Sequence, residues 1–172
     1  MDLRQSIPGI LTMSPPSPSL LGDLLAFSSQ ASGTLYLVAC VAKKLNCEAS
    51  AADLYQSDWF KKARAYVEAQ GAPWRILSAR YGLVAPHDWV KPYEQTLNAM
   101  TAIQRRAWAQ PVLQGILHLA PREVVFLAGR KYRENLTAPL VDAGVQVMVP
   151  MAGLGIGEQL GWLKSHGPAG RQ

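Results

Sequence analysis

The pattern of hydrophobic positions along the chain predicts four buried β-strands. Each strand is a short, nearly continuous run of apolar residues, which is typical of strands in a parallel sheet that is covered on both faces. The runs are Thr34–Cys40, Arg75–Ala79, Glu123–Ala128 and Val145–Val149. The segments between the runs place apolar residues at helical spacing, so that strands and helices alternate along the chain.

The ends of the intervening segments carry helix signals. Ser57 or Asp58 can cap a helix over about 58–70, and Thr101 can cap a helix over about 101–119. Shorter helices are expected over residues 49–55, 129–144 and 156–165. Alternation of this kind predicts βαβ units with right-handed crossovers. The expected fold class is therefore α/β, a three-layer Rossmann-like sandwich with a mainly parallel sheet of four or more strands.

The domain organisation follows from the same pattern. Residues 34–165 are expected to form a single α/β domain, and the chain of 172 residues is long enough for one hydrophobic core. Residues 1–33 are rich in Pro and Ser, which predicts an N-terminal tail or linker, and residues 166–172 are expected to be a C-terminal tail. No apolar run approaches the roughly 18 residues of a membrane span, and the N-terminus does not read as a secretory signal. The sequence therefore predicts a cytoplasmic protein without a membrane partner.

Charge and cysteine content narrow the classes of ligand. The net charge of +5 permits a nucleic-acid or nucleotide-like partner without requiring one. Cys40 and Cys47 supply neither a disulfide framework nor a four-ligand zinc set, and Cys40 at the end of a strand can simply be a small buried hydrophobe. No metal site and no cofactor is predicted.

The carboxyl ends of the predicted strands are the expected place for a site. In an open parallel sheet, ligands bind where the strand order reverses, at that edge of the sheet. The residues that follow the four strands should therefore converge on one rim. They are Cys40, Lys43 and Lys44 after the first strand, Ser78, Arg80, Tyr81, Gly82 and the loop with His87, Pro92 and Tyr93 after the second, Gly129, Lys131 and Tyr132 after the third, and Met151, Gly153, Gly155 and Gly157 after the fourth.

Each of these groups has a chemical interpretation beside a purely structural one. Lys43 is a potential nucleophile or phosphate ligand, or else a solvated loop residue. Cys40 would need a base as its partner, and His87 is the only histidine in a suitable loop. Tyr81 and Tyr93 can stack on a base or simply complete a turn. The glycine turn after the fourth strand can hold a phosphate at a helix N-terminus, or can let that helix pack close to the sheet.

A family resemblance rests on the residues around the second strand. Residues 77–93, LSARYGLVAPHDWVKPY, resemble the L-S-x-x-Y-G-x-x-x-P-x-D-x-x-x-P-Y signature of the YaaA (peroxide stress protein) family. Residues 41–45, VAKKL, are similar to that family's S-P-A-K-T-L segment, with Cys40 where the family has Ser. The stretch 34–163 is similar to small bacterial and phage domains related to YaaA, through C-x-x-K, D-L-Y-x-S-x-x-F over 53–60 and G-x-x-I-G-x-x-L-x-W-L over 153–163.

The resemblance implies a nucleic-acid or nucleobase-directed protein, associated with DNA binding and the response to oxidative stress. The first hypothesis is therefore glycosidic-bond or base-transfer chemistry with Lys43, Ser78 and Tyr81 as catalytic residues. The residues expected to bind the substrate are Cys40, Lys44, Gly82, His87, Pro92, Tyr93, Tyr132, Gly153, Gly155 and Gly157.

Two alternatives remain open at this point. One is a non-catalytic DNA-binding module that uses the cations of two helices, which are Lys61, Lys62, Arg64, Arg105 and Arg106. The other is a small-molecule enzyme that acts on a nucleotide or a sugar phosphate.

Overall fold

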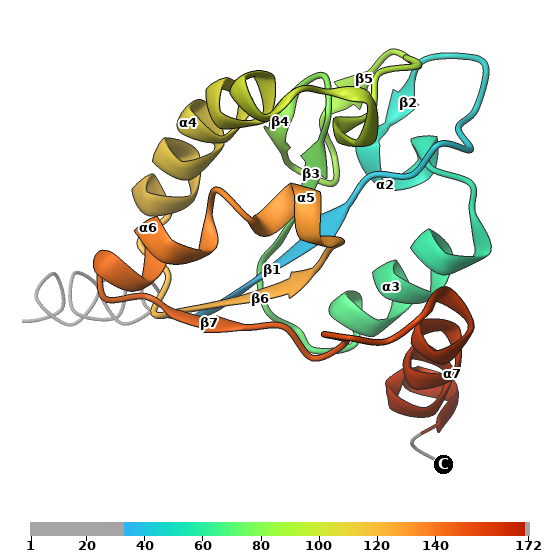
Figure 1. The fold of residues 1–172 in the computed structure, drawn as a ribbon. Coiled ribbons are helices and arrows are strands. Elements are labelled where there is room, and N and C mark those ends of the chain that lie inside the picture. The colour runs from blue at the N-terminus through green and yellow to red at the C-terminus, as the bar shows by residue number, and fades with distance from the viewer. Residues whose placement is uncertain (1–32, 171–172) are drawn as a thin grey trace, which may run out of the picture. The chain divides into compact units, whose positions relative to one another are not determined.

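Five strands form one sheet in the order β4-β3-β1-β6-β7 (Figure 1). The computed structural model describes residues 33–170. The strands are β1 (Thr34–Ala39), β3 (Trp74–Ser78), β4 (Gly82–Val84), β6 (Glu123–Leu127) and β7 (Gln146–Met148). Strands β1, β3, β6 and β7 run parallel to one another, and β4 pairs antiparallel with β3. The expected α/β class and its four strands are confirmed, and β4 is an addition that the apolar pattern did not predict.

The strand order reverses between β1 and β6. The chain moves outward from β1 to β3 and then returns past β1 to β6, which pairs with β1 on its other side. Val38 of β1 lies opposite Leu127 of β6 in this pairing. The carboxyl ends of these two strands are therefore the position at which an open α/β sheet forms a crevice for a ligand.

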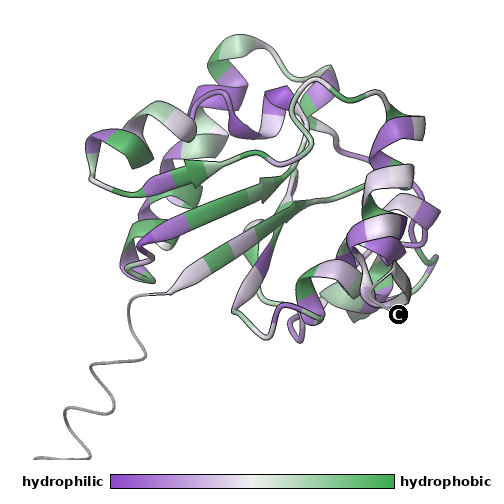
Figure 2. Cartoon of the chain, turned by 90° about the horizontal axis from the view of Figure 1, so that it is seen from below, coloured by the Kyte–Doolittle hydropathy of each residue, from purple (hydrophilic) through white to green (hydrophobic). Residues whose placement is uncertain are grey.

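The central strands are buried on both faces. Successive side chains of a strand point to opposite faces, and both Leu37 and Val38 of β1 are fully buried. The same holds for Ile76 and Leu77 of β3. Figure 2 shows that hydrophobic residues prevail along the strands of the sheet. Burial on both faces explains why the strands appear in the sequence as continuous rather than alternating apolar runs.

Helices lie on both sides of the sheet (Figure 1), with α3 packed against α7 on one side and α4 against α6 on the other. The helices are α2 (Ala51–Leu54), α3 (Asp58–Glu68), α4 (Ala102–His118), α5 (Arg130–Arg133), α6 (Thr137–Asp142) and α7 (Ile156–His166), with 3-10 turns η1 (Leu97–Ala99) and η2 (Pro168–Gly170). In residues 33–170, none of these helices is both long enough and apolar enough to span a membrane.

Two predicted helix caps are confirmed. The Ser57 hydroxyl accepts a hydrogen bond from the Phe60 N–H at 3.1 Å at the start of α3. Thr101 and Gln104 form a capping box at the start of α4, in which each side chain bonds to the backbone N–H of the other residue. These bonds satisfy backbone donors that have no partner inside the helix.

The single helix predicted over 129–144 is two short helices. Helix α5 ends at Arg133 and α6 begins at Thr137. Pro139 lies in the first turn of α6, where its missing N–H costs nothing, whereas the middle of a longer helix would lose a hydrogen bond there. The proline therefore fits a new helix start better than a continued helix.

The loop after β3 is more ordered than the sequence suggested. It contains β4 and a second short strand, β5 (Trp89–Val90), which pairs antiparallel with β2 (Ala49–Ser50). The backbone N–H of Ala51 also donates to the Asp88 carbonyl at 2.8 Å. The loop is thus fastened to the segment that follows β1. The tail expected over residues 1–33 lies outside the described residues except for Gly33, and so does the end of the C-terminal tail at 171–172.

Candidate functional site

A cavity of about 380 Å³ lies where the strand order reverses. We call it the small cavity. It is lined by the end of β1, the start of α5 and one residue each from η1, α3 and α7. The lining residues are Ala39, Cys40, Trp59, Asn98, Gly129, Arg130, Lys131, Tyr132 and Gln159. Two cations, a thiol and a phenol thus meet at the position that the topology marks for a ligand.

Buried hydroxyl groups and a thiol connect the ends of β1 and β3. The Tyr93 hydroxyl lies 2.8 Å from Ser78 Oγ and 2.9 Å from the Tyr55 hydroxyl. The Tyr132 hydroxyl lies 3.1 Å from Cys40 Sγ. All five side chains are buried. We call this set, Cys40, Tyr55, Ser78, Tyr93 and Tyr132, the hydroxyl network.

The tyrosines of the network remain protonated at neutral pH. Burial, and after it the electrostatic influence of the neighbouring Cys40, raises the pKa of Tyr55 from 10.0 to about 12. The same two causes raise the pKa of Tyr93. They also raise the pKa of Tyr132, although hydrogen bonds with Thr96 and Leu97 act in the opposite direction. A neutral phenol can both donate and accept a hydrogen bond, so that the Tyr132 hydroxyl can bond to Cys40 and to a ligand at the same time.

Several residues of the Ser-Ala-Arg-Tyr-Gly motif have structural roles in the turn after β3. The Tyr81 N–H donates to Ser78 Oγ at 3.0 Å across the turn. Gly82 has a φ of +73°, a left-handed conformation that side chains disfavour, and it closes a three-residue hairpin loop between β3 and β4. The Tyr81 ring then packs edge-on against Tyr93 at a centroid distance of 5.5 Å. The conformation of this turn and its contact with the hydroxyl network therefore depend on Ser78, Tyr81, Gly82 and Tyr93.

The two lysines after β1 lie in different environments. Lys44 Nζ is 4.4 Å from the centre of the Tyr93 ring, a cation–π contact with the hydroxyl network. Lys43 is exposed, and its carbonyl accepts a hydrogen bond from the Gln56 N–H. Among the described residues, it is Lys44 rather than Lys43 that contacts the network.

His87, the histidine considered as a possible base for Cys40, does not pair with it. The His87 side chain is 84% exposed, and its Nε2 lies 4.0 Å from Asp88 Oδ1. Cys40 is buried, with the Tyr132 hydroxyl beside its sulfur. Asp88 in turn accepts the Ala85 N–H at 2.8 Å and stabilises the loop. The His-Asp pair is therefore part of a surface turn, next to the exposed Pro92 segment.

The glycine turn before α7 carries an internal anion. Glu158 Oε2 accepts the Gly155 N–H at 2.7 Å, which places a carboxylate at the helix N-terminus where a phosphate was expected. Gly155 and Gly157 are exposed. Gly153, which has a φ of +79°, lines a further cavity of about 210 Å³.

Arginines provide the positive charge near that turn. Arg130 lines both this further cavity and the small cavity, and Arg133 lines the further cavity. The Nε atom of Arg133 is buried without a hydrogen-bond partner in the part of the chain that the structure describes. A buried donor without a partner is costly, which makes this position suited to an acceptor such as a phosphate oxygen.

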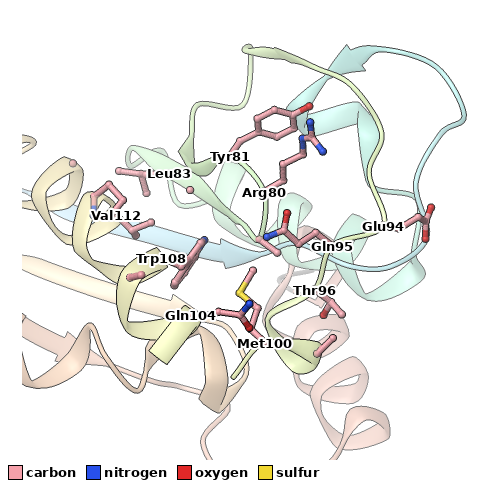
Figure 3. Close-up of a pocket in the computed structure, with 16 residues that line it drawn as sticks. Arg80, Tyr81, Leu83, Glu94, Gln95, Thr96, Met100, Gln104, Trp108 and Val112 are labelled. Carbon is pink, nitrogen blue, oxygen red and sulfur yellow. The ribbon is translucent and has the colours of Figure 1, made fainter. Parts of the chain in front are cut away.

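A larger cavity of about 850 Å³ lies between the hairpin turn and α4 (Figure 3). We call it the large cavity. Tyr81 and Gly82 line it from the turn, and Trp108 lines it from α4. The Trp108 ring lies edge-on to Tyr132 of the small cavity at 5.9 Å. The two cavities are therefore neighbours with an aromatic pair between them.

The structure brings together about half of the residues predicted for the site. Cys40, Lys44, Ser78, Tyr81, Gly82, Tyr93 and Tyr132 belong to the hydroxyl network, contact it or line one of the two cavities. Lys43, His87, Pro92, Gly155 and Gly157 lie on exposed turns.

The prediction missed several residues that line the cavities or belong to the hydroxyl network. Arg130 lies just after the third predicted strand, so its position could have identified it as a residue of the site. Tyr55, Asn98 and Trp108 gave no such signal, because they reach the site from other elements. Within residues 33–170, no three His, Cys, Asp or Glu side chains are grouped so that they could hold a metal ion.

These features define an α/β protein with ligand-sized cavities at the carboxyl edge of its parallel strands. A family model matches residues 35–165, and the chain belongs to that family, described as a family of unknown function (DUF6884). The matched residues contain the hydroxyl network and both cavities. Neither the curated proteins nor the solved structures contain a match to the chain.

Proposed function

We propose that the protein is a YaaA-like nucleobase-directed protein that binds a nucleotide unit, free or within a nucleic acid, at the small cavity. The observation that carries the proposal is the lining of this cavity, where Arg130 and Lys131 meet Cys40 and Tyr132 at the reversal of strand order. With helices on both sides of the sheet, we assign the fold to the Rossmann-like three-layer sandwiches, which bind nucleotides at this position.

Size and chemistry support a nucleotide. The volume of about 380 Å³ lies within the range of small-molecule sites. Arg130, which lines both this cavity and the further cavity, suits a phosphate group. Trp59 supplies an aromatic surface, and its indole N–H is fixed by Gln159 Oε1 at 2.9 Å. A phosphate and a planar base thus each have matching partners.

Glycosidic-bond or base-transfer chemistry is the reaction class that the YaaA resemblance adds to this binding role. Cys40 and Tyr132 line the cavity with Sγ and the phenol hydroxyl 3.1 Å apart, so that a thiol and a phenol adjoin a ligand bound there. They rank ahead of the exposed Lys43 as reacting groups. The same resemblance extends the proposal to DNA binding and a role in oxidative stress. The cytoplasmic location proposed with it rests on the sequence, which has neither a membrane-length apolar run nor a recognisable secretory signal.

The charges on the helices argue against a DNA-binding module that depends on them. Lys62 pairs with Asp58, and Arg64 pairs with Asp53 and Glu68. Arg105 pairs in the same way with Glu134. Cations neutralised by neighbouring carboxylates attract phosphate less than the cations at the small cavity do.

The test compares ligands and variants by thermal shift and calorimetry. AMP, ribose 5-phosphate and a single-stranded oligonucleotide are added to the wild-type protein and to Lys131→Ala, with the exposed Lys61→Ala as the matched control. We expect stabilisation by AMP or the oligonucleotide, and a loss of about tenfold or more in affinity for Lys131→Ala alone.

Other outcomes separate the alternatives. Equal binding of ribose 5-phosphate and AMP would favour an enzyme of sugar phosphates. A loss confined to Lys61→Ala would favour the helix cations and the DNA-binding module. Absence of stabilisation by all three ligands would contradict the proposal.

A further inference from the structure

The large cavity is distinct from the small cavity in position, size and charge. We propose that it is a second binding site, which takes a flat, uncharged heterocyclic ring with hydrogen-bond donors and acceptors on its edge. This inference goes beyond the proposed function, which concerns the small cavity, and does not depend on it.

Two glycines set the shape of the large cavity. A Cβ atom at Gly115 of α4 would lie 3.1 Å from Leu83 Cδ2, and one at Gly82 would lie 3.3 Å from Val112 Cγ2. The hairpin and the helix therefore lie so close that a Cβ atom at either glycine would displace the facing side chain by a few tenths of an ångström. Leu83 and Val112, together with the two glycines, give the cavity an apolar wall.

A fixed aromatic ring lies one helical turn before Val112 of this wall, on the same helix. The Trp108 indole N–H donates to the Ser78 carbonyl at 2.9 Å, and its ring is braced edge-on against Tyr132. A ring held at both its nitrogen and its edge loses little freedom when a ligand stacks on it. Met100 adds a polarizable sulfur to the lining, which suits contact with an aromatic ligand.

Two side-chain amides supply hydrogen-bonding groups. Gln95 makes no hydrogen bond to any of residues 33–170 through its side chain. Gln104 uses Oε1 to accept the Thr101 N–H at 2.8 Å, which leaves its Nε2 donors for another partner. Figure 3 shows Gln95, Gln104 and Trp108 close together. Amides can donate and accept at once, as the edge of a heterocycle requires, whereas a purely apolar ligand would leave them unpaired.

The charge at the cavity favours a neutral occupant. Among residues 33–170, the charged residues that line it are Arg80 and Glu94, one of each sign and both exposed. The Arg80 guanidinium lies 5.6 Å from the centre of the Tyr81 ring. By contrast, the charged side chains that line the small cavity are the cations Arg130 and Lys131. The lining charges therefore favour an anion in the small cavity and an uncharged ring in the large cavity.

The experiment uses adenosine, guanosine and uridine as neutral heterocycles, and indole as a flat ring with a poorer hydrogen-bonding edge. Binding to the full chain is measured by calorimetry and by ligand-observed NMR. Gln95→Ala removes the free amide. Gln104→Glu keeps the capping box, which favours Glu at this position, but replaces the amide donor. Gln110→Ala, on the exposed surface of the same helix, is the matched control.

We expect at least one nucleoside to bind the wild-type protein more tightly than indole. Its affinity should fall about tenfold in Gln95→Ala and in Gln104→Glu and stay unchanged in Gln110→Ala. Thermal melts identify any variant that has lost its fold, and replacing the exposed Gln95 removes no side-chain hydrogen bond to residues 33–170. Lys131→Ala separates this site from the small cavity and should leave nucleoside binding intact.

Three results would overturn the inference. In the first, no nucleoside binds. In the second, indole binds as tightly as the nucleosides and neither glutamine variant changes the affinity. In the third, Lys131→Ala loses nucleoside binding while both glutamine variants keep it. The last result would assign the nucleoside to the small cavity, and would thereby support the proposed function while removing this one.

Discussion

The hydroxyl of Tyr55 lies 2.9 Å from the hydroxyl of Tyr93, and both side chains are buried. The two residues are 38 positions apart, so this bond joins the segment after β1 to the loop after β3. Tyr93 also bonds to Ser78 and thus stands at the centre of the hydroxyl network.

Removing the central hydroxyl should destabilise the protein. Tyr93→Phe leaves the Tyr55 hydroxyl buried without its partner, which costs about 1–3 kcal/mol in the free energy of unfolding. Tyr55→Phe should cost less, because Tyr93 keeps its bond to Ser78. Urea denaturation of both variants and of the double variant measures the coupling between them. We expect the double variant to lose less free energy of unfolding than the two single variants lose together. Strictly additive losses would argue that the bond between the two hydroxyls contributes nothing to stability.

Alkaline pH should unfold the protein through its buried phenols. The pKa of Tyr55 rises from 10.0 in the unfolded chain to about 12 in the fold. The unfolded state therefore releases this proton first as the pH rises, so that the stability present below pH 10.0 is lost toward about pH 12. Tyr93 and Tyr132, whose pKa values are also raised, act in the same direction.

Tyrosinate absorbance and circular dichroism, recorded over the same pH series, test this expectation. Ionisation of the buried tyrosines should coincide with loss of the circular dichroism signal. Ionisation of all six tyrosines before any loss of structure would contradict it.

Acid pH should weaken the link between α4 and the residue after α5. The hydrogen bond from Arg105, together with its charge, holds the pKa of Glu134 below its ordinary value of 4.5. The pair therefore contributes stability above pH 4.5, and that contribution is lost as the pH falls through the lower pKa of the folded state. Glu134→Gln should lower the melting temperature at neutral pH and flatten its decline in acid. Asp142→Asn, at an exposed site, is the control and should keep the decline of the wild-type protein.

Replacing either of two glycines with alanine should change the stability of the protein, in opposite directions for the two positions. Gly82→Ala places a side chain at a φ of +73° and 3.3 Å from Val112, and should destabilise by about 1–2 kcal/mol or more. Gly161→Ala lies in α7, where an added Cβ meets no atom within 4 Å, and should stabilise by about 0.5–1 kcal/mol. Thermal melts of both variants decide the matter. A neutral Gly82→Ala would mean that the hairpin turn tolerates another conformation.

Local sequence patterns were sufficient to predict the central strands and the main helix caps. Leu37 and Val38 are adjacent and both buried, which only a strand covered on two faces allows. Ser57 and Thr101 bond to backbone groups three residues away, so that the signal and its partner lie close together in the sequence. Strand β4 escaped prediction because it has only three residues and begins with a glycine.

The cavities depend on contacts that no local pattern encodes. Apolar residues occur around much of α4, where Ile103 is 77% exposed while Val112 is buried, so periodicity could not indicate which face lines the large cavity. Lys43 and Lys44 are neighbours of the same type, yet only Lys44 packs on Tyr93. The difference arises from the path of the loop, which is set by its bonds to a distant segment.

Ser78 has contacts in two directions. Its side chain bonds to Tyr93 and accepts the Tyr81 N–H, while its carbonyl accepts the indole of Trp108. One residue thus sets the spacing of the hairpin, the phenols and the indole. An engineer who wishes to alter the lining of the large cavity should leave this position untouched and vary Gln95, whose side chain makes no hydrogen bond within the described residues.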